Sequence, residues 1–338
     1  MTRAARPWLW PLVPLYAAGA ALQRRLTQPR WLGQPVLSVG SCSAGGAGKT
    51  PLVALLAQAL AQRGLQVSIL SRGYGRASTA IEQVDPNGDA ARYGDEPLLL
   101  AQQTQAAVWV GADRYAAGQL AAQVAARHAT APLVHLLDDG LQHRRLGRDA
   151  NLVLLTAADC SDALLPAGNL REPLARLCEA DVVVLRAEEL AITQPVAHRL
   201  APSAALWTVR RRLVLPAALP SPVIAFCGIA RPENFASMLA EAGCQVAALV
   251  AFADHQTYGE AQRQRLLQAA IRHSATGFVT TAKDAVKLTP DLRQQLAQAG
   301  PVLTAELTLE LDDAARAVDA LWHLARDRYT RRHEKIGA

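Results

Sequence analysis

The chain has 338 residues, more than one hydrophobic core usually spans, so its length predicts two folded domains. Apolar residues make up 51% of the sequence and charged residues 19%, a balance that excludes a disordered or collagen-like chain. The net charge of +6 favours anionic partners such as phosphate groups or an acidic membrane surface, whereas a content of only 5% aromatic residues argues against nucleic acid as a partner.

An apolar run occupies most of residues 1–30. It extends from Pro7 to Leu22, contains Trp and Tyr side chains and is flanked by arginines, a composition typical of the headgroup boundary of a membrane. Because the run is short and interrupted by proline, we interpret it as a membrane-associated helix and not as a signal peptide. A helix that packs on the protein's own core is the alternative.

From Pro35 onward, short apolar runs alternate with longer stretches at helical spacing. This alternation is typical of βαβ units around a parallel sheet. It predicts a first α/β domain over residues 31–205. Strands are expected at 35–39, 67–71, 107–110, 133–137, 152–155 and 182–185, and helices at 50–62 and 114–127.

The segment from Gly40 to Thr50 follows an apolar strand and opens an Ala/Leu-rich helix, which is the context that a phosphate-binding loop requires. Glycines let several backbone N–H groups point at phosphates, Lys49 can reach the β- and γ-phosphate oxygens, and Thr50 can hold Mg²⁺. The usual first glycine of the motif is replaced by serine. The sequence therefore predicts a P-loop NTPase-like domain in which ATP is bound by Ser43, Ala44, Gly45, Gly46, Ala47, Gly48, Lys49 and Thr50.

Two acidic turns of the first domain are candidates for chemistry. Asp95 lies in a Gly-Asp-Glu-Pro turn, which is compatible with an ordinary helix cap and with a catalytic base. Asp138 and Asp139 follow a buried strand, at the sheet edge where ligands of open α/β sheets bind. We expect this pair to bind the metal together with Thr50, and a capped turn is the alternative reading.

The remaining sequence predicts an extended linker over 206–221 and a second, smaller α/β domain over 222–338. An arginine-studded stretch and three prolines mark the linker. The second domain should contain strands at 223–227, 245–251 and 277–280 and helices at 234–241, 259–273 and 313–329. His255 follows one of these strands, and by itself is as compatible with a surface histidine as with a catalytic one. We expect the active site in the cleft between the domains.

A set of motifs in this order resembles the tetraacyldisaccharide 4'-kinase family. The set extends from about Pro35 to Leu288 and is far more specific than the P-loop alone. It consists of Ser-Ala-Gly-Gly-Ala-Gly-Lys-Thr-Pro at 43–51, Ser-Arg-Gly-Tyr-Gly at 71–75, Gly-Asp-Glu-Pro at 94–97, Asp-Asp-Gly-Leu-Gln-His-Arg-Arg at 138–145, Leu-Pro-Ala-Gly-Asn-Leu-Arg-Glu-Pro at 165–173, Phe-Cys-Gly-Ile-Ala-Arg-Pro-Glu-Asn-Phe at 226–235, Asp-His at 254–255 and Thr-Ala-Lys-Asp-Ala-Val-Lys-Leu at 281–288.

This resemblance implies an ATP-dependent kinase of lipid A biosynthesis. Such an enzyme phosphorylates the 4'-hydroxyl of tetraacyldisaccharide 1-phosphate to give lipid IVA, at the cytoplasmic face of the inner membrane, and the N-terminal helix matches the family in character. Carried over by position, Asp95 resembles the catalytic base and His255 its partner. Two departures are small: Ala282 stands where the family usually has Glu, and the first P-loop position is Ser43, where the family also lacks glycine.

The expected mechanism is positioning and charge neutralisation around the γ-phosphate. Because Asp95 and His255 belong to different domains, their pair should form only when the cleft closes. Arg171 is expected to neutralise transferred charge or grip a substrate phosphate, with a surface ion pair to Glu172 as the alternative. Further candidates for contact with nucleotide or lipid, between which the sequence does not choose, are Arg72, Tyr74, Gln142 and His143.

A rival function is a membrane-associated regulatory P-loop ATPase of the partitioning type. Its loop also contains a Gly-Gly-x-Gly-Lys-Thr pattern, but Ala44 occupies the position of its signature lysine. A nucleotide-gated binding protein or metallochaperone GTPase is a third reading, of which Ala282-Lys283-Asp284 offers only a partial guanine-reading motif. For the kinase we expect a monomer whose partners are a lipid disaccharide and the membrane surface.

Overall fold

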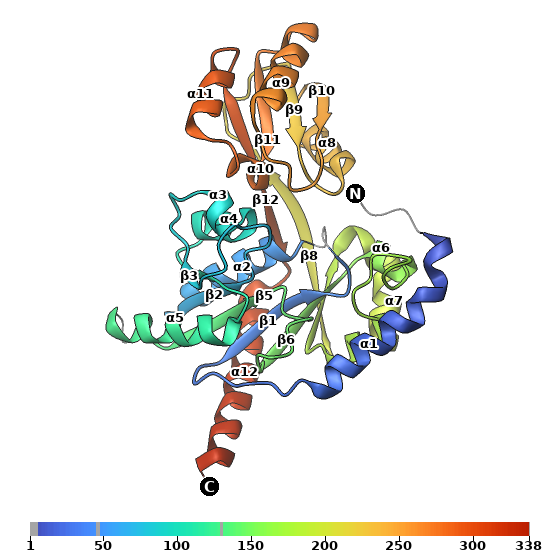
Figure 1. Cartoon of the computed structure of the whole chain (residues 1–338), viewed down its shortest axis with the longest axis vertical. Coiled ribbons are helices and arrows are strands. Elements are labelled where there is room, and N and C mark those ends of the chain that lie inside the picture. Colours follow the sequence, from blue (N-terminus) through green and yellow to red (C-terminus); the bar gives the residue numbers. More distant parts are fainter. Residues whose placement is uncertain (1–5, 45–47, 129–130, 338) are drawn as a thin grey trace.

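A computed structural model of the chain describes residues 6–44, 48–128 and 131–337. Within these residues the strands form a single 12-stranded sheet in the order β10-β9-β11-β12-β8-β7-β6-β1-β5-β2-β4-β3. Figure 1 shows a larger body and a smaller body that are joined by two long strands. The predicted α/β fold with a mostly parallel sheet is confirmed.

The larger body surrounds parallel strands whose residues are buried on both faces, so helices must cover both sides of the sheet. Each of the six strands predicted here begins and ends within two residues of its expected range. The parallel strands are β1 (Val36–Ser41), β2 (Gln66–Ser71), β4 (Ala107–Val110), β5 (Leu133–Asp138), β6 (Ala150–Leu155) and β7 (Val182–Arg186), and β3 (Glu82–Gln83) pairs antiparallel at the edge.

Helices of the larger body divide between the two faces of the sheet. On one face, α2 (Lys49–Ala61), α4 (Asp95–Gln103) and α12 (Ala314–Gly337) share a hydrophobic core with alternate strand residues. On the other face lie α5 (Arg114–His128) and α7 (Leu190–Leu200). Shorter helices of this body are α3 (Ala90–Tyr93), α6 (Ala157–Ser161), η2 (Leu174–Glu179) and η3 (Ala187–Glu189).

The two connecting strands are β8 (Ala205–Val214) and β12 (Val302–Leu311). β8 pairs in parallel with β7 and antiparallel with β12, and β12 pairs in parallel with β11, so the sheet runs without interruption into the smaller body. The arginine-rich stretch that the sequence predicts to be an extended linker is thus mostly a strand of the common sheet. Only its proline-rich part, after Val214, lies outside the strand.

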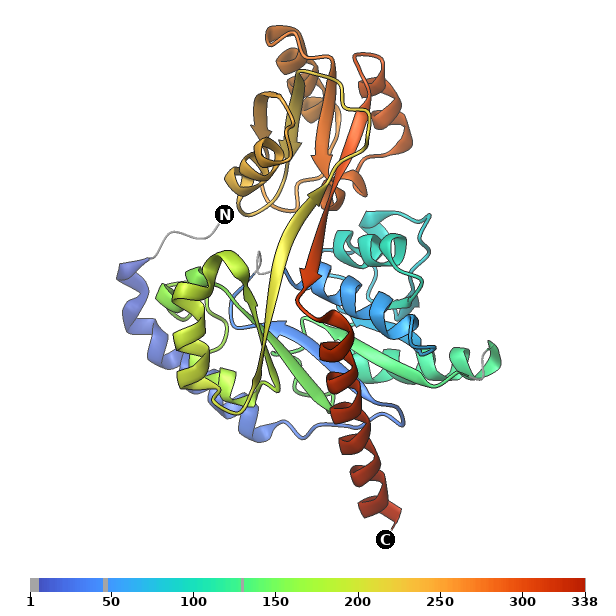
Figure 2. The same cartoon turned by 180° about the vertical axis from the view of Figure 1, so that it is seen from behind.

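The smaller body is a parallel sheet with helices. Its strands are β9 (Val223–Cys227), β10 (Val246–Ala251) and β11 (Gly277–Thr281), and its helices are α8 (Pro232–Glu241), α9 (Glu260–Arg272), α10 (Ala282–Ala285) and α11 (Pro290–Ala297). After β12 the chain leaves this body. Helix α12, which the sequence assigns to the second domain, packs against the larger body through Val318, Leu321 and Ala325 (Figure 2).

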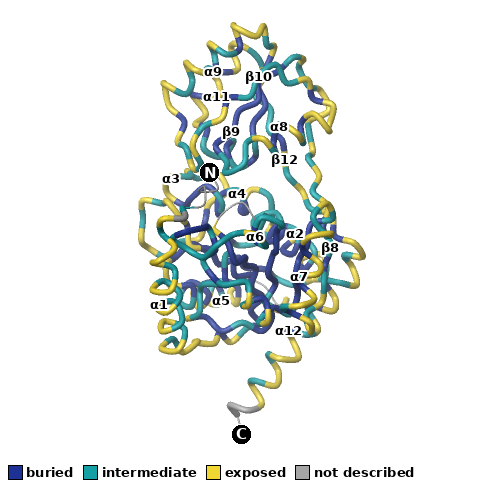
Figure 3. Tube along the Cα trace, turned by 90° about the vertical axis from the view of Figure 1, so that its right-hand side faces the viewer, coloured by how far each residue is buried: buried dark blue, intermediate teal, exposed yellow. Residues whose placement is uncertain are grey.

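The N-terminal segment forms η1 (Pro7–Leu12) and α1 (Val13–Leu26), which lie along the outside of the larger body. No side chain of α1 is buried, and the Leu15 side chain is 70% exposed. Figure 3 colours most of this segment, and the part of α12 that extends beyond the larger body as far as residue 334, as exposed or partly exposed. Across the described ranges, no helix combines the length and the apolar character needed to cross a bilayer.

Candidate active site

The segment predicted to be a phosphate-binding loop connects β1 to α2, at the carboxyl edge of the sheet. Gly48 adopts a φ of 95° immediately before the helix, a conformation that favours glycine, and Lys49 begins the helix. The Lys49 ammonium lies 3.2 Å from the Ser41 hydroxyl. Among the residues predicted to bind ATP, Gly45, Gly46 and Ala47 lie outside the described residues, so the expectation for them stays a prediction.

Asp139 lies opposite this loop and binds two cations. Its carboxylate is 3.3 Å from the Lys49 ammonium and 2.8 Å from the Arg171 guanidinium. Burial opposes ionisation of Asp139, but the two cations together outweigh it, so the pKa of this carboxyl is lowered. Arg171 therefore pairs with Asp139, whereas Glu172 pairs with Arg24 and Arg144.

Asp138, the residue immediately before Asp139, has a different environment. It is 3% exposed, and one carboxylate oxygen accepts a hydrogen bond of 2.9 Å from the Ser71 hydroxyl. Burial, with repulsion from Glu96 and Asp139, raises the pKa of Asp138 to about 7. Within the described ranges no three His, Cys, Asp or Glu side chains form a set that could hold a metal ion.

Asp95 and His255, which are 160 positions apart in the sequence, meet across the two bodies. Asp95 begins α4 after Gly94, is 6% exposed, and one carboxylate oxygen lies 2.9 Å from Nδ1 of His255. The other carboxylate oxygen accepts a hydrogen bond from the backbone N–H of Glu96. The pair that the sequence predicts to form on closure of the cleft is thus already in contact in this structure.

The electrostatics of this pair keep Asp95 ionised. Burial works against the charge of Asp95, but the hydrogen bond from His255 and the nearby Lys283 ammonium outweigh it and lower the pKa of the carboxyl. The hydrogen bond to Asp95 in turn raises the pKa of His255, against the opposing effects of burial and Lys283. Near neutral pH, Asp95 is therefore a carboxylate that can accept a proton.

Lys283 completes this half of the site. The sequence alone does not predict a role for it in catalysis or binding. Its ammonium lies 3.2 Å from the Glu96 carboxylate, 3.6 Å from that of Asp254 and 3.4 Å from Nε2 of His255. The Thr-Ala-Lys-Asp motif was a signal for it. Burial lowers the pKa of Lys283, but the surrounding carboxylates outweigh burial and raise it, so the side chain stays an ammonium.

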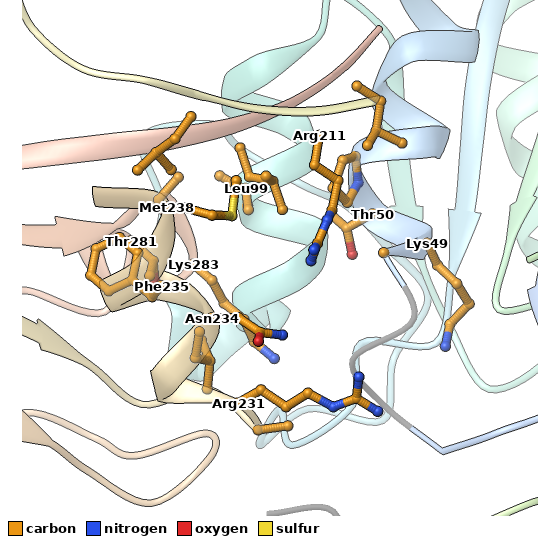
Figure 4. A pocket seen from close by; sticks show the side chains of 18 of the residues that line it. Lys49, Thr50, Leu99, Arg211, Arg231, Asn234, Phe235, Met238, Thr281 and Lys283 are labelled. Atoms are coloured by element: carbon orange, nitrogen blue, oxygen red, sulfur yellow. The ribbon is translucent and has the colours of Figure 1, made fainter. Parts of the chain in front are cut away.

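A cavity of about 260 Å³ lies between the two bodies and connects the two halves of the site. Figure 4 shows Lys49 and Thr50 on one side and Phe235, Met238 and Lys283 on the other. His255 and Glu96 also line it. The cavity therefore places the phosphate-binding residues and the surroundings of Asp95 around one space, as predicted for a cleft between domains.

The substrate-contact candidates occupy different environments. Tyr74 is 67% exposed, and its ring centroid lies 5.5 Å from that of His255, while Arg72 is exposed nearby in sequence. Gln142 donates a hydrogen bond to the Ser41 carbonyl and so supports the end of β1. Burial, with Arg114 nearby, lowers the pKa of His143 to about 4, which makes this ring neutral.

Arg114 is a buried cation that the sequence reasoning missed. It begins α5, is 7% exposed and feels the charges of Asp138 and Asp139. Burial, with repulsion from Arg72, lowers the pKa of Arg114 to about 10. Its position at the start of α5, in the connection that leaves β4 at the same sheet edge as the aspartates, is the signal that could have identified it.

The N-terminal helix adjoins the phosphate-binding half of the site. The Tyr16 hydroxyl donates a hydrogen bond to the Arg171 carbonyl, and the Arg24 guanidinium pairs with Glu172 at 3.0 Å. Several large apolar side chains of this segment are exposed, namely Trp8, Leu12, Leu15, Leu22 and Leu26, whereas Leu9 and Val13 are partly buried. The helix is thus held to the larger body through polar groups and presents an apolar stripe to the outside.

Comparisons with known proteins identify the family of the chain. The family model described as tetraacyldisaccharide-1-P 4'-kinase matches residues 5–325. Tetraacyldisaccharide 4'-kinase from Koribacter versatilis is 41% identical over 325 residues, covering 92% of this chain and 97% of the relative. The relative of the same name from Geobacter metallireducens is 40% identical over 302 residues, covering 83% of this chain and 86% of its own length.

A solved structure of LpxK from Aquifex aeolicus in complex with ATP superposes with a TM-score of 0.71 at 29% identity, covering 94% of this chain and 98% of that one. These matches do not favour the regulatory ATPase of the partitioning type. With a family model that matches nearly the whole sequence, and with close relatives of one name, the chain belongs to the tetraacyldisaccharide-1-P 4'-kinase family.

Proposed function

We propose that this member of the family transfers the γ-phosphoryl group of ATP to the 4'-hydroxyl of tetraacyldisaccharide 1-phosphate, with Asp95 as the general base. The observation that carries the proposal is the contact of 2.9 Å between Asp95 and His255, beside a cavity that Lys49 and Thr50 also line. Phosphoryl transfer to an alcohol requires a phosphate cradle and a base at one place, and the proposal is supported by a cavity that is lined both by Lys49 and Thr50 and by His255, the partner of Asp95.

Asp95 would accept the proton of the sugar hydroxyl as the oxygen attacks the γ-phosphorus. The carboxylate is ionised and has one oxygen fixed by a backbone N–H and the other by His255, so its orientation is set before substrate binds. As Asp95 gains the proton it loses its negative charge, and His255, with a raised pKa, is placed to share that proton. The Lys283 ammonium, 4.0 Å from the Asp95 carboxylate, favours the ionised form of Asp95 before the proton is transferred.

Lys49 and Arg171 are the cations proposed to neutralise the phosphate oxygens. Both now bind Asp139, so the binding of phosphate would draw them partly from this carboxylate. A guanidinium can bind two oxygens side by side, which suits a phosphoryl group in transfer. Tyr74, whose exposed ring lies next to that of His255, and Arg72, an exposed cation near Arg114, are proposed to contact the sugar or its lipid.

The donor set fits Mg²⁺, which the proposed reaction requires. Mg²⁺ prefers oxygen ligands and is commonly held by one or two carboxylates together with substrate phosphates. The buried Asp138 carboxyl, whose pKa is raised to about 7, forms no ion pair among the described residues and is an oxygen donor once ionised, and Asp139 and Thr50 are the other proposed ligands. When bound, the ion would neutralise charge on the β- and γ-phosphates.

We also propose that the enzyme works at the cytoplasmic face of the inner membrane, held there by α1. The exposed apolar stripe of this helix suits the interfacial region of a bilayer, and its basic residues Arg24 and Arg25 suit anionic headgroups. Because α1 contacts Arg171, docking through the stripe would bring the phosphate-binding half of the site near the membrane surface. The acyl chains of the substrate could then remain in the bilayer.

The test compares the wild type with Asp95→Asn in a thin-layer assay that uses radiolabelled ATP and the disaccharide monophosphate. The substitution keeps the shape of the side chain but removes the base, so kcat should fall by about two to four decades while ATP binding is retained. Asp291→Asn, at an exposed carboxylate of α11 away from the cavity, is the control and should stay within about twofold of wild type. A kcat of Asp95→Asn within threefold of wild type would refute the proposal.

A further inference from the structure

Three loops of the smaller body converge beneath the Asp95–His255 pair. They follow β9, β10 and β11, so they emerge at the same carboxyl edge of the parallel sheet. The loop after β10 carries His255, and the segment that directly follows β11 and forms the short helix α10 carries Lys283. The positions of these two side chains relative to Asp95 therefore depend on what holds the three loops together.

A single buried carboxylate contacts all three loops. Asp284 is 0% exposed, and one of its oxygens accepts hydrogen bonds from the Gly228 N–H at 3.0 Å and the Thr281 hydroxyl at 2.6 Å. The other oxygen accepts a hydrogen bond of 2.9 Å from the Tyr258 hydroxyl and lies 2.6 Å from the Lys287 ammonium. Gly228 belongs to the loop after β9, Tyr258 to that after β10 and Thr281 to the end of β11.

The loop that carries His255 needs such support. His255 has a φ of 59°, a left-handed conformation that costs on the order of 1–3 kcal/mol for a residue other than glycine. The loop is tied at its start by the Phe252 N–H, which donates to the Cys227 carbonyl, and at its end by Tyr258. Between them it lies directly on Gly228, where an added Cβ would come within 2.7 Å of the Ala253 carbonyl oxygen.

We propose that Asp284 is a positioning residue for phosphoryl transfer, which sets His255 and Lys283 against Asp95 through its bonds to Tyr258, Gly228 and Thr281. The proposal rests on the proposed function, because it assumes that the Asp95–His255 pair acts in the reaction. Asp284 does not line the cavity and touches no reacting atom. Its effect is the placement of two side chains that do line it.

Two variants test this role. Asp284→Asn removes the charge but leaves the buried Lys287 ammonium without its partner and so risks the fold. Tyr258→Phe is milder, because it removes only the hydroxyl that ties the His255 loop to Asp284. For Tyr258→Phe we expect kcat to fall about tenfold, with KM for ATP within about twofold, since small misplacement of a catalytic group slows chemistry more than it weakens binding.

Thr280→Val is the matched control. Thr280 is 0% exposed in β11 and donates one buried hydrogen bond, of 2.8 Å, to the Phe226 carbonyl, without contact to the Asp284 network. Tyr258→Phe and Thr280→Val therefore each remove one buried hydroxyl from the smaller body, at a similar cost in stability. Thr280→Val should leave kcat within about twofold of wild type.

A double-mutant cycle with His255→Ala separates this inference from the proposed function. If Tyr258 and Asp284 act through His255, the double variant Tyr258→Phe/His255→Ala should have a kcat within about twofold of that of His255→Ala alone. The pKa of the His255 ring, followed by NMR in histidine-labelled protein and assigned with His255→Ala, should move down toward its ordinary value in Tyr258→Phe and stay unchanged in Thr280→Val.

The outcomes are distinct. Equal losses of kcat in Tyr258→Phe and Thr280→Val, or a tenfold loss that persists in the His255→Ala background, would overturn the positioning role while leaving the proposed function intact. A wild-type kcat for His255→Ala would instead show that His255 is not the partner of the base, and would contradict that part of the proposed function. If Asp284→Asn does not fold, the Tyr258→Phe cycle still decides the question.

Discussion

At the scale of single residues, neighbours in the sequence acquire opposite properties from their surroundings. Asp138 and Asp139 are adjacent and chemically identical, yet the pKa of Asp138 is raised to about 7 and that of Asp139 is lowered. The difference arises because Lys49 and Arg171 lie next to Asp139, whereas Asp138 is buried and accepts a hydrogen bond from the Ser71 hydroxyl. The sequence predicts an acidic pair at the sheet edge, but only the fold assigns each acid its state.

The raised pKa of Asp138 predicts a pH-dependent affinity for Mg²⁺. A carboxyl with a pKa of about 7 is largely protonated at pH 6 and ionised at pH 8, and a metal ion binds the ionised form. Titration calorimetry of Mg²⁺ into the ATP-saturated protein should therefore show affinity that rises about tenfold from pH 6 to pH 8, with release of a proton near pH 7.

Asp138→Asn is the control for this prediction, because ATP itself contributes some pH dependence. The variant should bind Mg²⁺ more weakly and lose the part of the pH dependence that is due to Asp138. If wild type and variant follow the same pH curve, Asp138 is not the group that exchanges its proton for the metal.

At the scale of elements, most helices and strands follow from local patterns. The predicted strand at 223–227 matches β9, and the helix at 259–273 matches α9 within one residue at each end. Apolar period and flanking glycines or prolines define such elements without reference to the rest of the chain. The N-terminal helix is also predicted, but which of its faces contacts the protein depends on partners such as Glu172 and the Arg171 carbonyl.

The apolar stripe of α1 predicts a membrane-binding phenotype that is separate from catalysis. Leu15 and Leu22 are 70% and 59% exposed, and each should bury its side chain in the interface of the bilayer. The double variant Leu15→Asp/Leu22→Asp should reduce co-sedimentation with vesicles of phosphatidylethanolamine and phosphatidylglycerol at least about tenfold, because each lost side chain contributes about 1.5–3 kcal/mol.

The matched control adds the same charge to exposed polar positions, as Gln23→Asp/Gln28→Asp. It should retain most of the vesicle binding, and both double variants should keep kcat within about threefold on substrate dispersed in detergent. Equal sedimentation of the two double variants would show that the stripe does not hold the protein on the membrane.

At the scale of the whole molecule, the chain passes from the larger body to the smaller one and then returns. β8 and β12 carry the sheet from one body to the other, and α12 returns to the larger body after the smaller one is complete. Cross-strand ion pairs such as Arg212 with Glu310, at 2.9 Å, accompany the antiparallel pairing of the two strands. The C-terminal helix is therefore part of the core that supports the phosphate-binding loop.

This connection predicts that α12 stabilises the larger body. Leu321 is 2% exposed and belongs to the hydrophobic core that also contains side chains of α2. Leu321→Ala should lower the free energy of unfolding by about 2–5 kcal/mol in urea denaturation, because it removes buried methyl groups and leaves a cavity. Ile271→Ala, at a side chain that is 80% exposed, should change it by less than about 0.5 kcal/mol. A small effect of Leu321→Ala would show that α12 is not part of the folded core.

The sequence by itself determined the α/β class, the phosphate loop, most element boundaries and the family, because these are written in local spacing and in short motifs. The tertiary structure decided that the expected linker is mainly a strand, that α12 belongs to the larger body, and that Lys283 and Arg114 join the surroundings of the site. The physical reason is that strand pairing, burial and the approach of charges depend on residues far apart in the sequence, such as Asp95 and His255 with a separation of 160.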